Sequence, residues 1–146
     1  MAAPSARTIK RIFAVSGNRC AFPNCQAPIV DENGTIIGRI CHIEADSPGG
    51  PRYNPIQSSD ERQGFDNLIL MCANHHIIID DDYESYTIAR LKKIKADHEQ
   101  KYANGEEPTN DIVDKLLQTI NGIFIGSTVI TQDQMGGQAA NYINNY

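Results

Sequence analysis

The chain has 146 residues, which is enough for one compact domain and an extension but not for two full domains. Its content of 40 % hydrophobic and 21 % charged residues is typical of a globular protein. No apolar run reaches the ~20 residues that a membrane span requires, and the basic N-terminus lacks the apolar segment of a secretory signal. We therefore expect a cytoplasmic protein with no membrane partner.

The net charge of −5 at first disfavours a nucleic-acid partner, because phosphates attract basic proteins. The acidic excess is concentrated near the C-terminus, however, where residues 102–146 contain one basic residue, Lys115, and five acidic ones. The first 101 residues are close to balance, with 12 basic and 13 acidic side chains. Charge therefore neither supports nor excludes binding to nucleic acid.

The N-terminal part predicts a helix followed by a β-hairpin. Apolar residues at helical spacing indicate a helix over residues 6–16, with Ser5 as its N-cap. A strand over residues 27–30, a turn at Asn33-Gly34 and a second strand over residues 35–43 are typical of a hairpin.

The middle of the chain begins with a long polar stretch, residues 45–66, that is rich in Gly, Pro and Ser. A loop of this length inside a compact domain usually carries function. We expect a strand over residues 67–71 and a helix over residues 73–80 after it. A longer helix over residues 87–102 follows, with Thr87 as its N-cap.

The last part of the chain differs in character from the rest. Residues 104–110 are a linker by composition, so we assign the first domain to residues 5–103. The extension, residues 111–146, contains an amphipathic helix and a β-rich run at residues 123–131. Elements of this size are marginal alone and need cover. The extension could pack back on the domain, but we favour a homo-oligomer or a regulatory partner.

Four cysteines and four histidines suggest a metal site. Cys20 and Cys25 form a C-x4-C knuckle, and Cys72 and His75 form a C-x2-H pair where a helix begins. Residues i and i+3 share one side of a helix, so the two pairs supply the four ligands of a tetrahedral structural zinc. Disulfides are the alternative, but they belong to secreted proteins. Cysteines acting only as small buried hydrophobes are a second alternative.

A second group of polar residues suits the hydrolysis of a phosphodiester. His42 ends a predicted strand, Asn67 closes the long loop, and His76 follows on the next helix. The order strand, loop, strand, helix would bring the three around one concavity. An imidazole with a pKa near ~6.5 can take a proton from water at cellular pH, and a second imidazole can hold a divalent cation. An asparagine amide can orient the base or pin the loop.

Other side chains near this group are candidate metal ligands. Asp80 stands four residues after His76 and shares its helix face, so it is either a carboxylate ligand or a solvated acid. Cys41 and His42 point to opposite faces of their strand, so we expect Cys41 to face the core or the zinc. Glu44 shares the His42 side and could assist the metal.

Three segments carry a specific resemblance to a known family. Arg39-Ile-Cys-His-Ile-Glu-Ala45, Asp66-Asn-Leu-Ile-Leu-Met-Cys72 and Ala73-Asn-His-His-Ile-Ile-Ile-Asp80 resemble the successive motifs of the HNH (ββα-metal) nucleases. Residues 86–99 resemble the helix that often follows the motif in bacterial members, and the similarity covers about residues 9–102. The resemblance implies an α+β fold: a small ββα-metal domain with structural zinc knuckles, flanking helices and a C-terminal helix/strand extension.

The resemblance also implies an activity, a metal-dependent endonuclease. In that family the first histidine is the general base, the asparagine orients it, and the last histidine binds Mg²⁺ or Mn²⁺; these roles fall on His42, Asn67 and His76. Cys41 stands where many members have a metal-binding Asp or His. The catalytic ion would then be held by His76 and Asp80, with water and substrate phosphate as its other ligands.

The sequence also suggests which residues contact the substrate and what the substrate is. Arg39, Arg52 and Arg62 are candidate phosphate contacts, although one or two could instead cap loop carbonyls. We favour DNA over RNA as the nucleic acid. The resemblance suggests an effector in a bacterial defence or restriction system, and the alternative is a non-catalytic zinc-stapled nucleic-acid-binding module.

Overall fold

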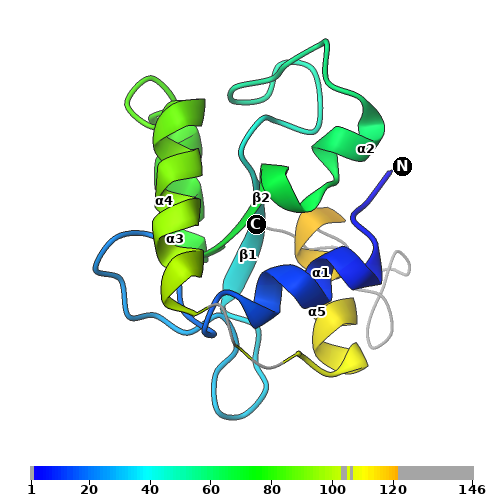
Figure 1. Ribbon diagram of the computed structural model, residues 1–146, viewed down its shortest axis with the longest axis vertical. Helices are drawn as coiled ribbons and strands as arrows, with labels where there is room; N and C mark the ends of the chain where they lie inside the picture. Colours follow the sequence, from blue (N-terminus) through cyan, green and yellow to red (C-terminus); the bar gives the residue numbers. More distant parts are fainter. Residues whose placement is uncertain (1, 103–104, 106, 122–146) are drawn as a thin grey trace, which may run out of the picture.

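A two-stranded antiparallel sheet lies at the centre of the molecule (Figure 1). Strand β1 (Gly38–His42) pairs with strand β2 (Leu68–Cys72), with Gly38 opposite Cys72 and His42 opposite Leu68. The computed structural model describes residues 2–102, 105 and 107–121. The protein is thus a small α+β protein over the part of the chain that is described.

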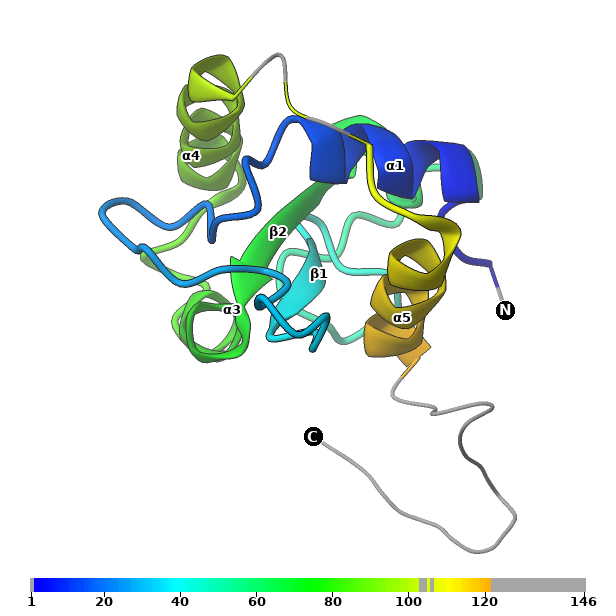
Figure 2. The same ribbon diagram turned by 90° about the horizontal axis from the view of Figure 1, so that it is seen from below.

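Helices cover both faces of this sheet (Figure 2). Helices α3 (Ala73–Asp81) and α4 (Ile88–Lys101) lie on one side, on the left of the view. Helices α1 (Ala6–Ala14) and α5 (Asn110–Asn121) lie on the other side. The strand, loop, strand, helix order expected around the long loop is therefore present as β1, β2 and α3.

The two faces of the sheet contribute to two separate hydrophobic cores because successive strand residues point in opposite directions. The core under α3 and α4 contains alternate strand residues together with apolar residues of both helices: Cys41, Ile43, Ile69, Met71, Ile79, Leu91 and Ile94. The core under α1 and α5 contains the other set: Ile9, Ile12, Ile40, Leu68, Leu70, Val113 and Leu116.

The helix boundaries follow the local signals in the sequence. The Ser5 hydroxyl accepts a hydrogen bond from the Thr8 N–H at 3.1 Å, and the Thr87 hydroxyl accepts one from the Arg90 N–H at 3.2 Å. Both predicted N-caps are confirmed, because a side-chain oxygen satisfies an N–H that the helix itself leaves free.

The first predicted hairpin strand, residues 27–30, is wrong. Val30 forms only an isolated bridge, and no strand is present there. Pairing with the second hairpin strand extends no further than this Val30–Ile36 bridge, which is flanked by bonds from the Asp31 N–H to the Thr35 carbonyl at 2.9 Å and from the Ile37 N–H to the Ile29 carbonyl at 2.8 Å. On its other edge Val30 is bonded by the Asn18 side chain, which donates to the Val30 carbonyl at 2.9 Å and accepts from the Val30 N–H at 2.8 Å.

The second hairpin strand begins later than predicted, at Gly38 rather than at residue 35. The Ile29 carbonyl accepts the N–H groups of both Ile37, at 2.8 Å, and Gly38, at 2.9 Å. Two consecutive residues opposite one is the pattern of a β-bulge, which interrupts regular pairing. The regular sheet therefore starts only after this bulge.

The long loop between the strands contains short helices of its own. Helix α2 (Ser59–Arg62) starts with a capping box, in which the Ser58 hydroxyl and the Glu61 carboxylate each accept from the other residue's N–H. A 3-10 turn, η1 (Phe65–Asn67), leads directly into β2. The loop is thereby folded back against the end of β1.

The helix of the C-terminal extension packs back on the domain. Val113 and Leu116 of α5 are buried in the core shared with α1, and the Ile40 N–H of β1 donates to the Thr119 hydroxyl at 3.4 Å. The remainder of the extension, including the β-rich run, lies outside the described residues, and a homo-oligomer or regulatory partner stays a prediction. None of the helices described is both long and apolar enough to cross a membrane.

The packing of α5 predicts a loss of stability on truncation of its buried side chains. Leu116→Ala should lower the free energy of unfolding by about 2–4 kcal/mol, because Leu116 is fully buried and the change leaves a cavity. Urea unfolding followed by circular dichroism measures it. Asp114→Ala, at an exposed position of the same helix, should change stability by less than about 0.5 kcal/mol. Equal effects would show that α5 does not belong to the core.

Candidate metal centre and active site

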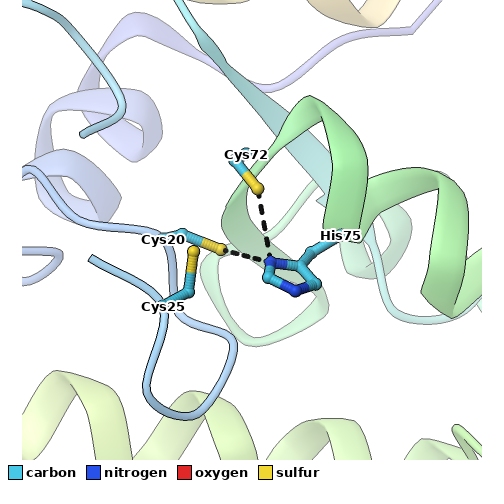
Figure 3. A group of neighbouring side chains, drawn as sticks. All are labelled: Cys20, Cys25, Cys72 and His75. Atoms are coloured by element: carbon cyan, nitrogen blue, oxygen red, sulfur yellow. Dashed lines mark hydrogen bonds between the residues drawn. The ribbon is translucent and has the colours of Figure 1, made fainter. Parts of the chain in front are cut away.

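Four side chains from three elements converge at one end of the sheet (Figure 3). Cys20 and Cys25 lie on the knuckle after α1, Cys72 is the last residue of β2, and His75 lies in the first turn of α3. Their ligand atoms are all within 4.8 Å of one another. These four residues, hereafter the Cys3His cluster, therefore lie close enough to bind a metal ion, as the two sequence pairs predicted.

The spacing within the Cys3His cluster can be compared with that around a tetrahedral ion. Bonds of about 2.3 Å to sulfur and 2.0 Å to nitrogen at tetrahedral angles put neighbouring sulfur and nitrogen ligands about 3.5 Å apart. The Nδ1 atom of His75 lies 3.5 Å from Cys20 Sγ and 3.3 Å from Cys72 Sγ. The donor set and its size thus fit one four-coordinate ion.

The surroundings hold the ligands in place. The Phe22 ring stacks parallel on the His75 imidazole at 3.9 Å, and the Phe22 N–H points to Cys20 Sγ at 3.5 Å. The Ala21 N–H donates to the Leu70 carbonyl at 3.0 Å, which attaches the knuckle to β2. Without a cation, burial raises the pKa of the Cys20 thiol to about 12, so binding of a metal must displace protons.

Cys41 belongs to the core and not to this cluster. Its side chain is fully buried between the sheet and α3, and its thiol contacts the Arg39 carbonyl at 3.7 Å. Burial raises the pKa of the Cys41 thiol well above its ordinary value, which disfavours the thiolate that a metal would need. Of the two positions expected for Cys41, the structure selects the core.

The Cys3His cluster predicts one tightly bound metal ion per chain. Cys72→Ser should remove most of the bound metal and lower the unfolding temperature, because one strong ligand is lost. Cys41→Ala is the matched control, since it removes another buried thiol but should leave the metal content unchanged. Elemental analysis after gel filtration measures both. Equal metal loss in the two variants would contradict the assignment of the ligands.

A second polar group lies on α3, one turn beyond the cluster. His76 Nε2 lies 3.1 Å from Asp80 Oδ2, and Arg52 Nη2 lies 2.7 Å from Asp80 Oδ1. Burial alone would raise the pKa of the Asp80 carboxyl, but the hydrogen bonds from His76 and Arg52 outweigh it and lower that pKa. Asp80 is thus a paired carboxylate and not a freely solvated acid.

His76 and Asp80 line an open hollow of about 540 Å³ together with Arg39. The rest of the lining is Ala73, Ile77 and Asp81. Each of the His76 and Asp80 side chains is about one third exposed, at 34 % and 32 %. The Arg39 guanidinium donates to the carbonyls of Ile37 at 3.3 Å and Gly38 at 2.9 Å, so the hollow is bordered by an imidazole, a carboxylate and a partly engaged guanidinium.

His42 does not line this hollow, and its ring contacts Gln63, a residue that was not predicted from the sequence. Its Nε2 atom is 3.0 Å from Gln63 Oε1, and Gln63 Nε2 in turn donates to Asp46. The capping-box pattern at Ser58 and Glu61 was the available signal, because a short helix there brings residue 63 back toward the strand.

Asn67 pins the loop and does not touch the His42 ring. Its Oδ1 accepts the Glu44 N–H at 2.9 Å, and its Nδ2 donates to the carbonyls of Glu44, at 2.9 Å, and Arg62, at 3.0 Å. The side chain is buried, at 3 % exposure, with both ends of the amide engaged. Of the two roles expected for this asparagine, the hydrogen bonds favour fixing the backbone that follows His42.

Arg52 is engaged within the protein and is not open to a phosphate. Its guanidinium donates to the carbonyls of Ile43 at 2.6 Å, Ile79 at 2.9 Å and Tyr86 at 3.4 Å, in addition to Asp80. Only 5 % of the side chain is exposed. Arg52 thus caps carbonyls and joins the end of β1 to α3.

Two further candidates also serve the loop. Arg62 donates to the Tyr53 hydroxyl and to the Asn54 carbonyl, both at 3.0 Å. The Glu44 carboxylate accepts from Asn54 at 2.9 Å and from Gln57 at 3.2 Å, with no contact to His76 among the described hydrogen bonds. Of the three arginines proposed as phosphate contacts, Arg39 alone lines the hollow.

The single concavity expected around His42, Asn67 and His76 is therefore not what the structure has. Cys41 faces α3, so the alternation of β1 sends His42 toward the other side of the sheet. Element order alone could not reveal this, because it does not say on which face of the sheet a side chain lies. Arg52 connects the two sides through its bonds to Ile43 and Asp80.

The chain matches no protein-family model and no curated protein.

The position of Arg52 predicts a large effect on stability. Arg52→Met should lower the free energy of unfolding by about 3 kcal/mol, because it leaves Asp80 and three carbonyls without their buried donor. Arg7→Met, at an exposed position of α1, removes the same charge and should change stability by less than about 0.5 kcal/mol. Urea denaturation compares the two; a similar small effect would remove Arg52 from its joining role.

Proposed function

We propose that the protein is a metal-dependent HNH endonuclease that hydrolyses phosphodiester bonds in DNA within a ββα-metal domain. The observation that carries the proposal is the hollow in which His76, Asp80 and Arg39 meet, beside the strand that ends at His42. The motif order and the Cys3His cluster next to it support the same assignment.

The metal of the Cys3His cluster is proposed to be a structural zinc. Three thiolates and one imidazole form a closed tetrahedral set, which is the ligand number and type of structural zinc sites. A closed set has no open position for substrate or water. The role of this ion is therefore to join the knuckle to β2 and α3 and not to take part in hydrolysis.

The catalytic ion is proposed to be Mg²⁺ or Mn²⁺ held by His76 and Asp80. Neighbouring ligands of an octahedral ion with bonds of about 2.1 Å lie about 3.0 Å apart. The observed separation of 3.1 Å between Nε2 and Oδ2 fits this spacing as well as it fits a direct hydrogen bond. Such an ion, when bound, polarises the phosphate and stabilises the charge that develops on its oxygens.

The side chains of the protein supply the other steps. Hydrolysis of one phosphate requires His42 and the His76–Asp80 pair to reach it around the end of β1, where Arg52 joins the two sides. His42 then takes a proton from a water molecule, and the oxygen keeps the electron pair and attacks phosphorus. One ester P–O bond breaks, its oxygen leaves with the bonding electrons, and solvent protonates it. Arg39 in the hollow balances negative charge on the phosphate. Asn67 holds the backbone after His42 so that the imidazole keeps its place.

Control of cutting is assigned to the extension and not to the catalytic core. Bacterial defence and restriction systems commonly fuse HNH domains to control modules, and the resemblance to such family members suggests this setting. The extension, residues 111–146, is the part of the chain to which we assign the homo-oligomer or regulatory partner.

The proposal predicts DNA cleavage that depends on a divalent ion and on His42. The protein with Mg²⁺ or Mn²⁺ should nick or cut supercoiled plasmid, and EDTA should stop it. His42→Ala should lower the rate at least 100-fold, because a general base typically contributes ~10²–10⁴-fold. Gel analysis of cleavage measures this, and zinc content and circular dichroism should be unchanged.

His98→Gln is the matched histidine control. His98 lies on α4 and bonds the Ser16 carbonyl at 2.7 Å, away from the hollow, and glutamine keeps a donor there. This variant should cut like the wild type. Cutting by His42→Ala at the wild-type rate would overturn the mechanism. Binding of DNA without cleavage under any of these conditions would favour the zinc-stapled binding module, and cleavage of RNA alone would correct the substrate.

A further inference from the structure

The partners of the His42 imidazole determine which of its nitrogens carries a proton. The ring contacts Gln63 through Nε2 at 3.0 Å, and Gln63 contacts Asp46 through its other amide atom. A carboxylate can only accept hydrogen bonds, so the amide group that faces Asp46 must be the NH₂ of Gln63. The amide oxygen of Gln63 must then face His42.

This orientation leaves one arrangement for a neutral imidazole. An amide oxygen only accepts, so the hydrogen bond to His42 exists only if Nε2 carries the proton. A neutral imidazole has one protonated and one unprotonated nitrogen. The lone pair of His42 is therefore on Nδ1.

We propose that Gln63, oriented by Asp46, is a positioning residue that fixes the His42 ring with its proton on Nε2 and presents Nδ1 as the proton acceptor for the attacking water. The base role rests on the proposed function, whereas the tautomer rests on the hydrogen bonds alone. In the reaction the proton of the water moves to Nδ1, and the electron pair of that O–H bond stays on the oxygen.

The clamp formed by Gln63 and Asp46 is built into the fold. Gln63 is 8 % exposed and is the C-cap of α2, where its N–H bonds the Ser59 carbonyl at 3.1 Å. The next residues along the chain lead through η1 to Asn67, whose amide is anchored to Glu44. The segment that carries Gln63 is thus held at its Asn67 end against the chain that follows His42.

No other side chain described near His42 takes this role. The Asn67 amide, which the sequence analysis assigned to orienting the base, is used entirely on the backbone of Glu44 and Arg62. The orienting function therefore falls on a residue four positions earlier in the chain.

The tautomer can be measured directly by ¹⁵N NMR of histidine-labelled full-length protein, at about pH 9, well above the ordinary imidazole pKa of about 6.5. His42→Ala assigns the signals by their loss. Wild type should show a protonated Nε2 and an unprotonated Nδ1. Asp46→Asn should shift both signals toward a mixture, because the Gln63 amide is then free to turn over.

Two matched variants sharpen this test. Asp60→Asn removes the same charge from an exposed position of the same loop and should leave the His42 signals unchanged. The double variant Asp46→Asn with Gln63→Glu exchanges donor and acceptor within the clamp but keeps an acceptor oxygen against His42. It should restore the wild-type tautomer. A proton on Nδ1 in wild type, or no change in Asp46→Asn, would overturn the proposal.

Cleavage tests the catalytic consequence. Gln63→Leu should lower kcat about 10–100-fold with little change in KM, as expected for loss of a group that orients a reactive side chain. An unchanged kcat in Gln63→Leu would contradict the positioning role. A protein with the expected tautomer that cuts neither DNA nor RNA would support the clamp and contradict the proposed function, so the two failures are distinguishable.

Discussion

The small size of the sheet is the constraint on which the rest of the structure depends. It has two strands of five residues each, and a two-stranded sheet alone is marginal in water. Three attachments support it: a hydrophobic core on each face and the Cys3His cluster at the Cys72 end. Because the cluster joins the knuckle, β2 and α3, a bound ion would contribute directly to the folding free energy.

Arg52 provides the corresponding attachment at the other end of the sheet. It joins the residue after His42 to the helix that carries His76, through carbonyls and Asp80. A buried arginine with this many acceptors has little freedom, so Arg52 fixes the chain after His42 against α3, the helix that carries His76 and Asp80. Through Arg52, the long loop thus holds the end of β1 against α3.

Two polar residues of the loop have different contacts around His42. Asn67 fixes the backbone after His42, and Gln63 contacts the ring itself. These are separate tasks, and the resemblance to HNH nucleases assigned the orienting task to the asparagine. A short helix inside the loop, α2, is what carries Gln63 to the ring. The arrangement is therefore a product of loop folding and not of the three-residue motif.

Local signals in the sequence were sufficient for the helix caps, the order of the elements and the Cys3His cluster, because each depends on residues that are near one another in the chain or on ligand spacing. They failed at residues 27–30, where hairpin pairing is limited to one bridge and ends at a bulge opposite Ile29. They also could not place His42 and His76 on their sides of the sheet, or remove Arg52 from contact with phosphate. These features are set by contacts between residues distant in sequence, so only the tertiary structure decides them.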